Sequence, residues 1–341
     1  MKLLPTLTAF LALAGAAAPQ IAQAQMFPPV VETQSRDLTV AERNAAIDAV
    51  LQALEAQYVF PDRVPAMRDA LRAAQAAGRY DTSAPLTFAE RVSQDLNRAS
   101  GDGHLYLRWD PEQFAAAGRE AAADDGPDLD AVWEARFRKM NYGLTEQKVL
   151  PGNVRYLKIS LFGWANDEAG AYDAAMQFLK GGDAVIIDLR GNGGGSHDAV
   201  RYALSHFMKP DELLITFLEA GQKPYDSRTL THLPAGRMIG KPLYVLVDNR
   251  AASAGEEFAY SVQQFGLGTL IGQTTAGGAN NNRFVPIAPG FMLSVSYGRP
   301  EHPKTGTNWE GVGVKPDVEV PADQALERAQ ALAREALAAL R

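Results

Sequence analysis

A serine with the setting of a nucleophile lies at the predicted start of a helix. Ser253 follows the apolar run from Leu243 to Val247 and begins the segment Ser-Ala-Gly-Glu-Glu-Phe-Ala, so a buried strand should end just before it. Its hydroxyl would then lie near the positive end of the helix dipole, beside backbone N–H groups that could hold an oxyanion. The same residues form a capping box with Glu256, so a helix cap without chemistry is the alternative.

A glycine-rich loop, Asp188-Leu-Arg-Gly-Asn-Gly-Gly-Gly-Ser196, follows another predicted buried strand. Glycines such as Gly193 and Gly194 allow backbone N–H groups to point at an anion. A Walker loop is excluded because no Gly-Lys-Ser/Thr follows, and a dinucleotide loop is disfavoured because Ser196 would be its third small residue. A strand-to-helix turn without a ligand is the remaining alternative.

A carboxylate and a histidine complete the candidate groups. Glu310 lies in the glycine-dense stretch from Thr305 to Asp317, and His104 follows Gly101-Asp-Gly at the junction of a predicted helix and a predicted strand. The histidines show none of the paired spacings of a zinc helix, and the chain has no cysteine. We therefore expect no metal centre and no disulfide, although the adjacent pair His197-Asp198 stays open as a ligand pair.

The elements that must position these groups fall into two parts. Capping-box signatures at Thr39 and Thr87, followed by helical spacing of apolar residues, predict a small helical bundle. Later strands are apolar on consecutive positions and alternate with helices, which is typical of an α/β fold. The sequence predicts a helical domain over residues 25–110, a connector over 111–150 and an α/β domain over 151–341 that ends in a helix.

Composition narrows the class of protein. The chain has 341 residues, of which 46% are hydrophobic and 21% charged, and its formal charge is −7. A folded protein is therefore expected, and nucleic acid is disfavoured as a partner.

The N-terminal residues predict a signal peptide over residues 1–24 that is cleaved after Ala24, and hence a periplasmic or secreted protein. The prediction rests on Lys2, on the apolar run that follows it and on Ala22-Gln-Ala24. That run is too short for stable membrane insertion.

Four motifs taken together resemble the S41 family of serine peptidases, the C-terminal processing and tail-specific proteases with their tricorn-core relatives. They are Val185-Ile-Ile-Asp-Leu-Arg-Gly-Asn-Gly-Gly-Gly195, Ala252-Ser-Ala-Gly-Glu-Glu-Phe-Ala259, Gly272-Gln-Thr-Thr-Ala-Gly-Gly278 and Asn308-Trp-Glu-Gly-Val-Gly-Val-Lys-Pro-Asp317. The helical part, with Tyr58-Val-Phe-Pro and Asp102-Gly-His-Leu, is similar to the branch that includes the interphotoreceptor retinoid-binding protein modules. The resemblance implies a crotonase/ClpP-like superhelix of ββα units behind a helical bundle, with no PDZ domain evident.

The resemblance also implies roles for three side chains. Ser253 matches the nucleophile, His104 the general base and Glu310 the carboxylate that orients the site. The processing peptidases use a lysine base where this chain has Gly278, so a Ser-Lys dyad is not available here. Gly103 stands where tricorn has a serine, which leaves open how Glu310 reaches His104.

The activity implied is that of an exported serine endopeptidase, which cleaves unstructured polypeptides near apolar C-terminal ends by acyl transfer. The N–H groups of Ala254 and of Gly193 or Gly194 would form the oxyanion hole. A polypeptide substrate is the expected partner, with no cofactor and no metal, and the oligomeric state is not indicated. The alternative is a non-catalytic module that binds apolar ligands on the same scaffold, in which Ser253 is only a cap.

Overall fold

The computed structural model describes residues 36–122, 135, 137–164 and 169–339 of the chain. Its helices are α1 (Val40–Gln57), α2 (Val64–Ala76), α3 (Pro85–Ser100), α4 (Pro111–Ala122), α6 (Gly170–Lys180), α7 (His197–Ser205), α8 (Ala254–Gln264) and α9 (Ala325–Ala339). Its strands are β1 (Tyr106–Trp109), β2 (Leu144–Leu150), β3 (Val154–Ile159), β4 (Ala184–Asp188), β5 (Leu213–Glu219), β6 (Tyr225–Arg228), β7 (Leu243–Val247), β8 (Thr269–Gly272), β9 (Asn281–Ile287), β10 (Phe291–Glu301) and β11 (Val318–Glu319). No helix among these residues is both long enough and apolar enough to cross a membrane.

The first sheet, called the central sheet, has the order β11-β8-β7-β4-β3-β2. All of its pairings are parallel except that of β2 with β3. Every residue of β4 and β7 is buried, as their consecutive apolar residues predict, because α6, α7 and α8 pack on one face and α9 on the other. Parallel strands end at the same edge, so the loops after β4 and β7 lie side by side.

The second sheet, called the bridging sheet, is antiparallel and has the order β1-β10-β5-β6, with β9 also paired to β10. Strand β10 is long, and its two halves serve different parts of the molecule. Its first half pairs with β1 and contributes Phe291, Leu293 and Val295 to the core of the helical bundle. Its second half pairs with β5, whose Leu214, Ile215 and Phe217 lie in the core shared with α8. The bridging sheet therefore joins the two cores.

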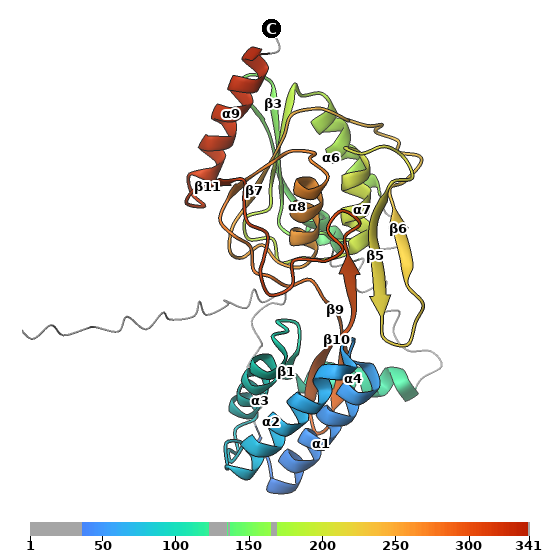
Figure 1. The fold of residues 1–341 in the computed structure, drawn as a ribbon, viewed down its shortest axis with the longest axis vertical. Helices are drawn as coiled ribbons and strands as arrows, with labels where there is room; N and C mark the ends of the chain where they lie inside the picture. The colour runs from blue at the N-terminus through green and yellow to red at the C-terminus, as the bar shows by residue number, and fades with distance from the viewer. Residues whose placement is uncertain (1–35, 123–134, 136, 165–168, 340–341) are drawn as a thin grey trace, which may run out of the picture.

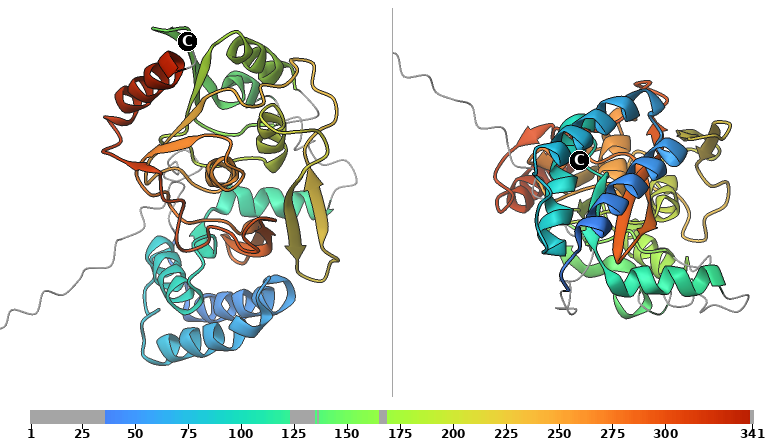
Figure 2. Two further views of the ribbon diagram at one scale, coloured as in Figure 1. Left: turned by 45° about the horizontal axis from the view of Figure 1, so that its top comes forward. Right: turned by 90° about the horizontal axis from the view of Figure 1, so that it is seen from below.

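The helical bundle of α1, α2 and α3 lies at one end of the molecule and the central sheet at the other, with β9 and β10 between them (Figure 1). Figure 2 shows α1 lying across the β9–β10 hairpin, against which it packs. Thr39 and Glu42 form the predicted capping box of α1. The third helix begins at Pro85 and not at Thr87, because proline is favoured at the first position of a helix.

The α/β fold behind a helical bundle is confirmed, and no PDZ domain is evident among the described residues. The predicted signal peptide over residues 1–24 lies outside those residues. The division at residues 110 and 150 stays a prediction. The bundle core nevertheless includes Ile287 and Phe291 from the far end of the sequence, so the helical part does not complete its own core.

Candidate active site

Ser253 lies where the sequence predicts, between β7 and α8. It is half-buried and immediately precedes Ala254, the first residue of α8. Its backbone has φ 53° and ψ −121°, a conformation that residues with a side chain rarely adopt. Strain of this kind costs about 1–3 kcal/mol and is typical of functional sites.

This backbone predicts an unusual order of stability for two variants. Glycine normally destabilises a protein relative to alanine, by about 0.5–1 kcal/mol. At residue 253 we expect the reverse. The free energy of unfolding of Ser253→Gly should exceed that of Ser253→Ala by about 1 kcal/mol, because glycine adopts a positive φ without strain. Urea unfolding of the two variants measures the difference. An alanine variant as stable as the glycine variant, or more so, would contradict the strained conformation.

The glycine loop after β4 packs directly on Ser253. A Cβ atom at Gly194 would lie 2.8 Å from Cβ and 3.2 Å from Oγ of Ser253, so only glycine permits this approach. Asn192, fully buried, holds the two loops together, because its carbonyl oxygen accepts a hydrogen bond from the N–H of Ala252 at 2.9 Å. Its side chain donates to the carbonyl of Ile159 at 2.9 Å, which ties the loop to β3.

The two glycines proposed as oxyanion donors differ in their hydrogen bonds. The N–H of Gly194 already donates to Oδ1 of Asn192 at 2.8 Å. Within the described part of the chain, the N–H of Gly193 has no acceptor. The N–H of Ala254 lies in the first turn of α8, where backbone N–H groups lack an intrahelical partner. Gly193 and Ala254 are therefore the donors that remain available.

Glu256 connects the Ser253 loop to the segment that follows β8. One carboxylate oxygen, Oε2, accepts hydrogen bonds from the N–H of Ser253 at 3.0 Å and from the N–H of Gly278 at 2.8 Å. The other accepts from the N–H of Gly277 and the hydroxyl of Thr275 at 2.6 and 2.5 Å. Burial raises the pKa of Glu256 to about 7 in spite of these four donors.

His104 lies against the same segment. It is half-buried and precedes β1, and its carbonyl oxygen accepts a hydrogen bond from Oγ of Ser294 in β10 at 2.5 Å. A Cβ atom at Gly278 would lie 2.7 Å from Cε1 of the imidazole, so the ring occupies the space that a side chain at residue 278 would need. A lysine at residue 278 and the observed position of His104 exclude each other.

Two carboxylates accompany His104. One ring nitrogen of His104 and one oxygen each of Asp102 and Glu310 lie within 4.8 Å of one another. Glu310 accepts hydrogen bonds from the N–H groups of Ala279 and Asn280 at 2.6 and 3.0 Å through Oε2. Its other oxygen accepts from the N–H of Gly103 at 3.4 Å. Residue 103 thus reaches Glu310 through its backbone N–H group, which needs no side chain.

Burial shifts the pKa values of the side chains around His104. It lowers the pKa of His104 below its ordinary value, and the charge of Asp102 opposes part of this change. Burial and the charge of Asp102 raise the pKa of Glu310 to about 7. Asp102 is fully buried and accepts hydrogen bonds from the hydroxyl of Tyr58 at 3.1 Å and the N–H of His104 at 2.9 Å. Burial therefore favours the neutral forms of both His104 and Glu310.

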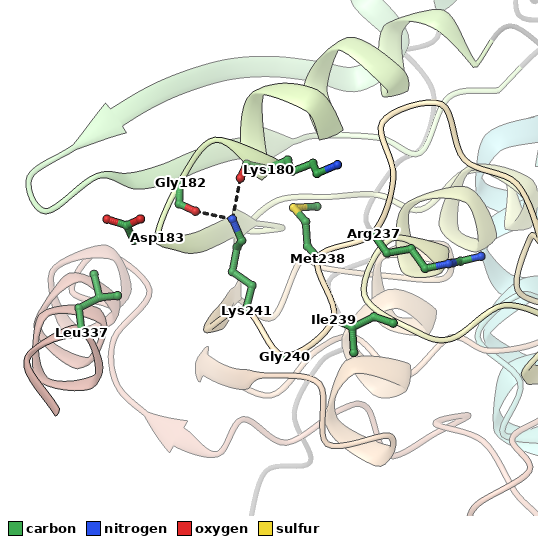
Figure 3. Close-up of a pocket in the computed structure, with 9 residues that line it drawn as sticks. All are labelled: Lys180, Gly182, Asp183, Arg237, Met238, Ile239, Gly240, Lys241 and Leu337. Carbon is green, nitrogen blue, oxygen red and sulfur yellow. Dashed lines mark hydrogen bonds between the residues drawn. The ribbon is translucent and has the colours of Figure 1, made fainter. Parts of the chain in front are cut away.

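A hollow of about 700 Å³ in the described structure lies away from Ser253 (Figure 3). Its lining includes Lys180, Asp183 and Lys241, at the edge where β4 and β7 begin, whereas Ser253 and the glycine loop follow the opposite ends of these strands. The amino group of Lys241 is bound to the carbonyl oxygens of Lys180 and Gly182. This cation is used to satisfy backbone groups, and the hollow has no part in the Ser253 site.

Two family models match this chain in the regions that carry the site. The model of peptidase family S41 matches residues 153–320, and the model described as the N-terminal domain of Peptidase_S41 in eukaryotic IRBP matches residues 39–133. The chain belongs to peptidase family S41. The S41 model includes Ser253 and Glu310, and the N-terminal model includes His104.

Individual proteins agree with the assignment to S41. The carboxy-terminal processing protease CtpB of Bacillus subtilis is 31% identical over 155 residues, which are 45% of this chain and 31% of that protein. A lipoprotein from Streptococcus agalactiae superposes with a TM-score of 0.54 at 14% identity, covering 89% of this chain and 99% of the other. The photosystem II D1 C-terminal processing protease gives 0.51 at 16% identity, covering 84% and 94%. These two structures show the likeness of fold.

The match spans about a third of the length of the first curated relatives. The roles of single residues in this chain therefore rest on its own geometry. Sequence reasoning found Ser253, His104 and Glu310, which the structure gathers around one segment, residues 275–280.

Three further residues lie at this candidate site and were not among the residues predicted for it. Asp102 lies two residues before His104, so its proximity could have been inferred from the sequence. Glu256 was interpreted as half of a capping box, although its carboxylate also binds Thr275 and Gly277 from a distant segment. Asn192 had no signal beyond its place among glycines, because its partners come from other strands and loops.

Proposed function

We propose that this S41 chain is a serine endopeptidase that cleaves unstructured polypeptides near apolar C-terminal ends. The observation that carries the proposal is that one buried carboxylate joins the backbone of Ser253 to the residue on which His104 packs. Oε2 of Glu256 accepts from the N–H of Ser253 and from that of Gly278, the residue on which the His104 ring packs. The name of a relative, carboxy-terminal processing protease, supports the substrate class.

In the proposed reaction His104 removes the proton of the Ser253 hydroxyl as Oγ attacks the carbonyl carbon of the scissile peptide bond. The carbonyl electrons move onto oxygen, and the N–H groups of Ala254 and Gly193 donate to that oxyanion. The imidazolium then gives its proton to the leaving amine, and an acyl enzyme on Ser253 remains. Water, deprotonated by His104, releases the acid and restores the hydroxyl.

Glu310 is proposed to stabilise the imidazolium that forms on His104. Its carboxylate lies within 4.8 Å of a ring nitrogen and is fixed by three backbone N–H groups. An ionised Glu310 offsets the positive charge, and a protonated one does not. The site should therefore become more active as Glu310 loses its proton.

The pH dependence of hydrolysis follows from this role. Because burial and Asp102 raise the pKa of Glu310 to about 7, kcat/KM should rise through about pH 7 as the carboxylate forms. Glu310→Gln should lower kcat and remove this rise, since the amide does not titrate. Asp102→Asn should move the rise to lower pH, because the repulsion that raises the pKa of Glu310 is gone. Profiles of kcat/KM from pH 5 to 9 measure both shifts, and an unchanged midpoint in Glu310→Gln would rule out this assignment.

Export is part of the proposal and rests on the sequence alone. Lys2, the apolar run and Ala22-Gln-Ala24 are typical of a cleaved signal peptide, and the mature chain would begin at Gln25 in the periplasm or the medium.

The experiment that tests the substrate class uses two unstructured peptides of equal length. One ends in apolar residues and the other ends in charged residues at the same positions. We expect kcat/KM to be at least about tenfold higher for the peptide with the apolar tail. The burial of a few apolar groups in a binding site gives discrimination of about this size. Equal rates would contradict the preference, and cleavage of neither peptide would contradict the peptidase proposal and favour the non-catalytic module.

A further inference from the structure

A second polar cluster lies outside the groups assigned so far. Nδ1 of His197 is 2.7 Å from Oε1 of Glu257, and Nε2 is 2.6 Å from Oγ of Ser227. The edge of the imidazole also meets the ring of Phe217, with the ring centroids 4.7 Å apart. Glu257 is 6% exposed and Ser227 is 9% exposed, so both polar partners of the imidazole are buried. None of these side chains takes part in the reaction proposed for Ser253.

The cluster joins three elements that surround the candidate nucleophile. His197 is the first residue of α7 and follows the glycine loop directly. Glu257 lies in α8, and its N–H donates to the carbonyl oxygen of Ser253 at 2.9 Å. Ser227 lies in β6, opposite Ile215 of β5. A single imidazole thus links the glycine loop, the helix of Ser253 and the edge of the bridging sheet.

The bridging sheet is the element that carries His104. From β6 the pairing runs through β5 and β10 to β1, which begins two residues after His104. Ser294 of β10 also binds the carbonyl of His104. Ser253, in contrast, belongs to the central sheet and its helices. The separation of Ser253 from His104 therefore depends on how the two sheets are held against each other.

We propose that His197 is a positioning residue that holds the helix of Ser253 in register with the bridging sheet and thereby sets the separation of Ser253 from His104. This inference rests on the proposed function, in which these two side chains exchange a proton. Proton transfer and attack require the reacting groups within hydrogen-bonding distance, and a displacement of about 1 Å can cost about 100-fold in rate.

The charged groups around His197 stabilise its hydrogen bond with Glu257. Burial alone would lower the pKa of His197, but Glu257, with a smaller contribution from Asp198, raises it above its ordinary value, and the nearby Arg201 opposes them. With a proton on Nδ1, the ring donates to the buried carboxylate of Glu257 in both its neutral and its protonated form. Both ring nitrogens are engaged, which fixes the orientation of the imidazole.

The same three side chains have the order of a serine, a histidine and a carboxylate, but Ser227 is poorly placed as a nucleophile. It lies within β6, its strand is paired with β5, and its side chain is almost fully buried. Among the described residues no helix follows Ser227 directly in the chain, whereas α8 begins at the residue after Ser253. The geometry assigns Ser227 the part of an anchor for His197.

The test measures the reaction of Ser253 with a fluorophosphonate, which needs an activated serine but no substrate site. Ser227→Ala breaks the link to the bridging sheet and leaves His197 paired with Glu257, and His197→Ala breaks both links. For each variant we expect the labelling rate constant and kcat to fall at least about tenfold, with KM within about twofold of the wild type. The final labelled fraction should stay that of the wild type, because every molecule remains folded. Ser227→Thr, which keeps the hydroxyl, should restore most of the rate.

A matched control is Thr216→Val in β5. The hydroxyl of Thr216 donates to Asp226 within the same hairpin at 2.9 Å but makes no link to α7 or α8, so its loss should leave the rate unchanged. Unchanged rate constants in Ser227→Ala and His197→Ala, or a loss of labelled fraction at an unchanged rate, would overturn the inference. Labelling of Ser227 in a Ser253→Ala protein would overturn it as well. A wild type that is not labelled at Ser253 would instead contradict the proposed function.

Discussion

Replacement of Ser253 by alanine is expected to lower kcat/KM for an unstructured peptide by at least about 10⁴-fold, because no other group at the site can form the acyl enzyme. The fold should survive. Ser253 is half-buried, and the N–H group that Glu256 binds belongs to the backbone, which alanine retains. Steady-state hydrolysis together with circular dichroism separates the loss of chemistry from a loss of folded protein.

The alternative role of Ser253 makes a different prediction for the same variant. A serine that only caps α8 stabilises the protein by about 1 kcal/mol, and its loss leaves the function of the site intact. A Ser253→Ala protein that hydrolyses the peptide as fast as the wild type would therefore identify Ser253 as a cap. The size of the expected effect leaves no overlap between the two outcomes.

His104→Ala is expected to lower kcat/KM by about 10³-fold or more, since the hydroxyl of Ser253 then has no base to take its proton. The imidazole packs on Gly278, so its removal opens space and breaks none of the hydrogen bonds made by the backbone of residue 104. The folded protein should thus be retained, with Ser253 and Glu256 in place.

The matched control for the base is Lys304→Ala. The processing peptidases use a lysine, and Lys304 is the first lysine after Ser253 in this chain. Lys304 is exposed, in a turn that lies outside the segment of residues 275–280, so its removal should leave kcat/KM unchanged. Loss of activity in Lys304→Ala, with full activity in His104→Ala, would contradict the assignment of the base.

The central sheet could be predicted from the sequence because its strands follow simple rules. Strands β4 and β7 are apolar at every position and buried at every position, and each is followed by a loop that ends in a helix. The loops that carry Gly194 and Ser253 then meet because parallel strands end at one edge of a sheet. Local pattern and topology together predict these elements, whereas the roles proposed for Ser253 and the glycine loop came from the family resemblance.

The bridging sheet could not be predicted in the same way. Strand β10 buries Ser294 and Ser296 together with apolar residues, so it does not alternate as a half-buried strand should. Strand β9 contains Pro286, which argues against a strand in the interior of a sheet. These strands gain their stability from β1 and from the bundle, which are distant in the sequence, and no local pattern records that contact.

The contacts of Glu310 could not be predicted from the sequence for a related reason. Its role was inferred from a motif, but its partner at Gly103 is 207 residues away and is a backbone N–H group. Because every residue except proline has a backbone N–H group, the residue type at this position does not indicate such a contact. The absence of a serine at residue 103 therefore raised a question that only the geometry could address.

Mapping the site of fluorophosphonate attachment identifies the nucleophile and its base in one experiment. The wild type and His104→Ala would be labelled, digested and analysed by mass spectrometry, with the rate constant of attachment measured for each. We expect one adduct in the wild type, on the peptide that contains Ser253, and attachment in His104→Ala slower by about 10³-fold. An adduct on another serine would exclude Ser253 as the nucleophile, and equal rates for the two proteins would exclude His104 as its base.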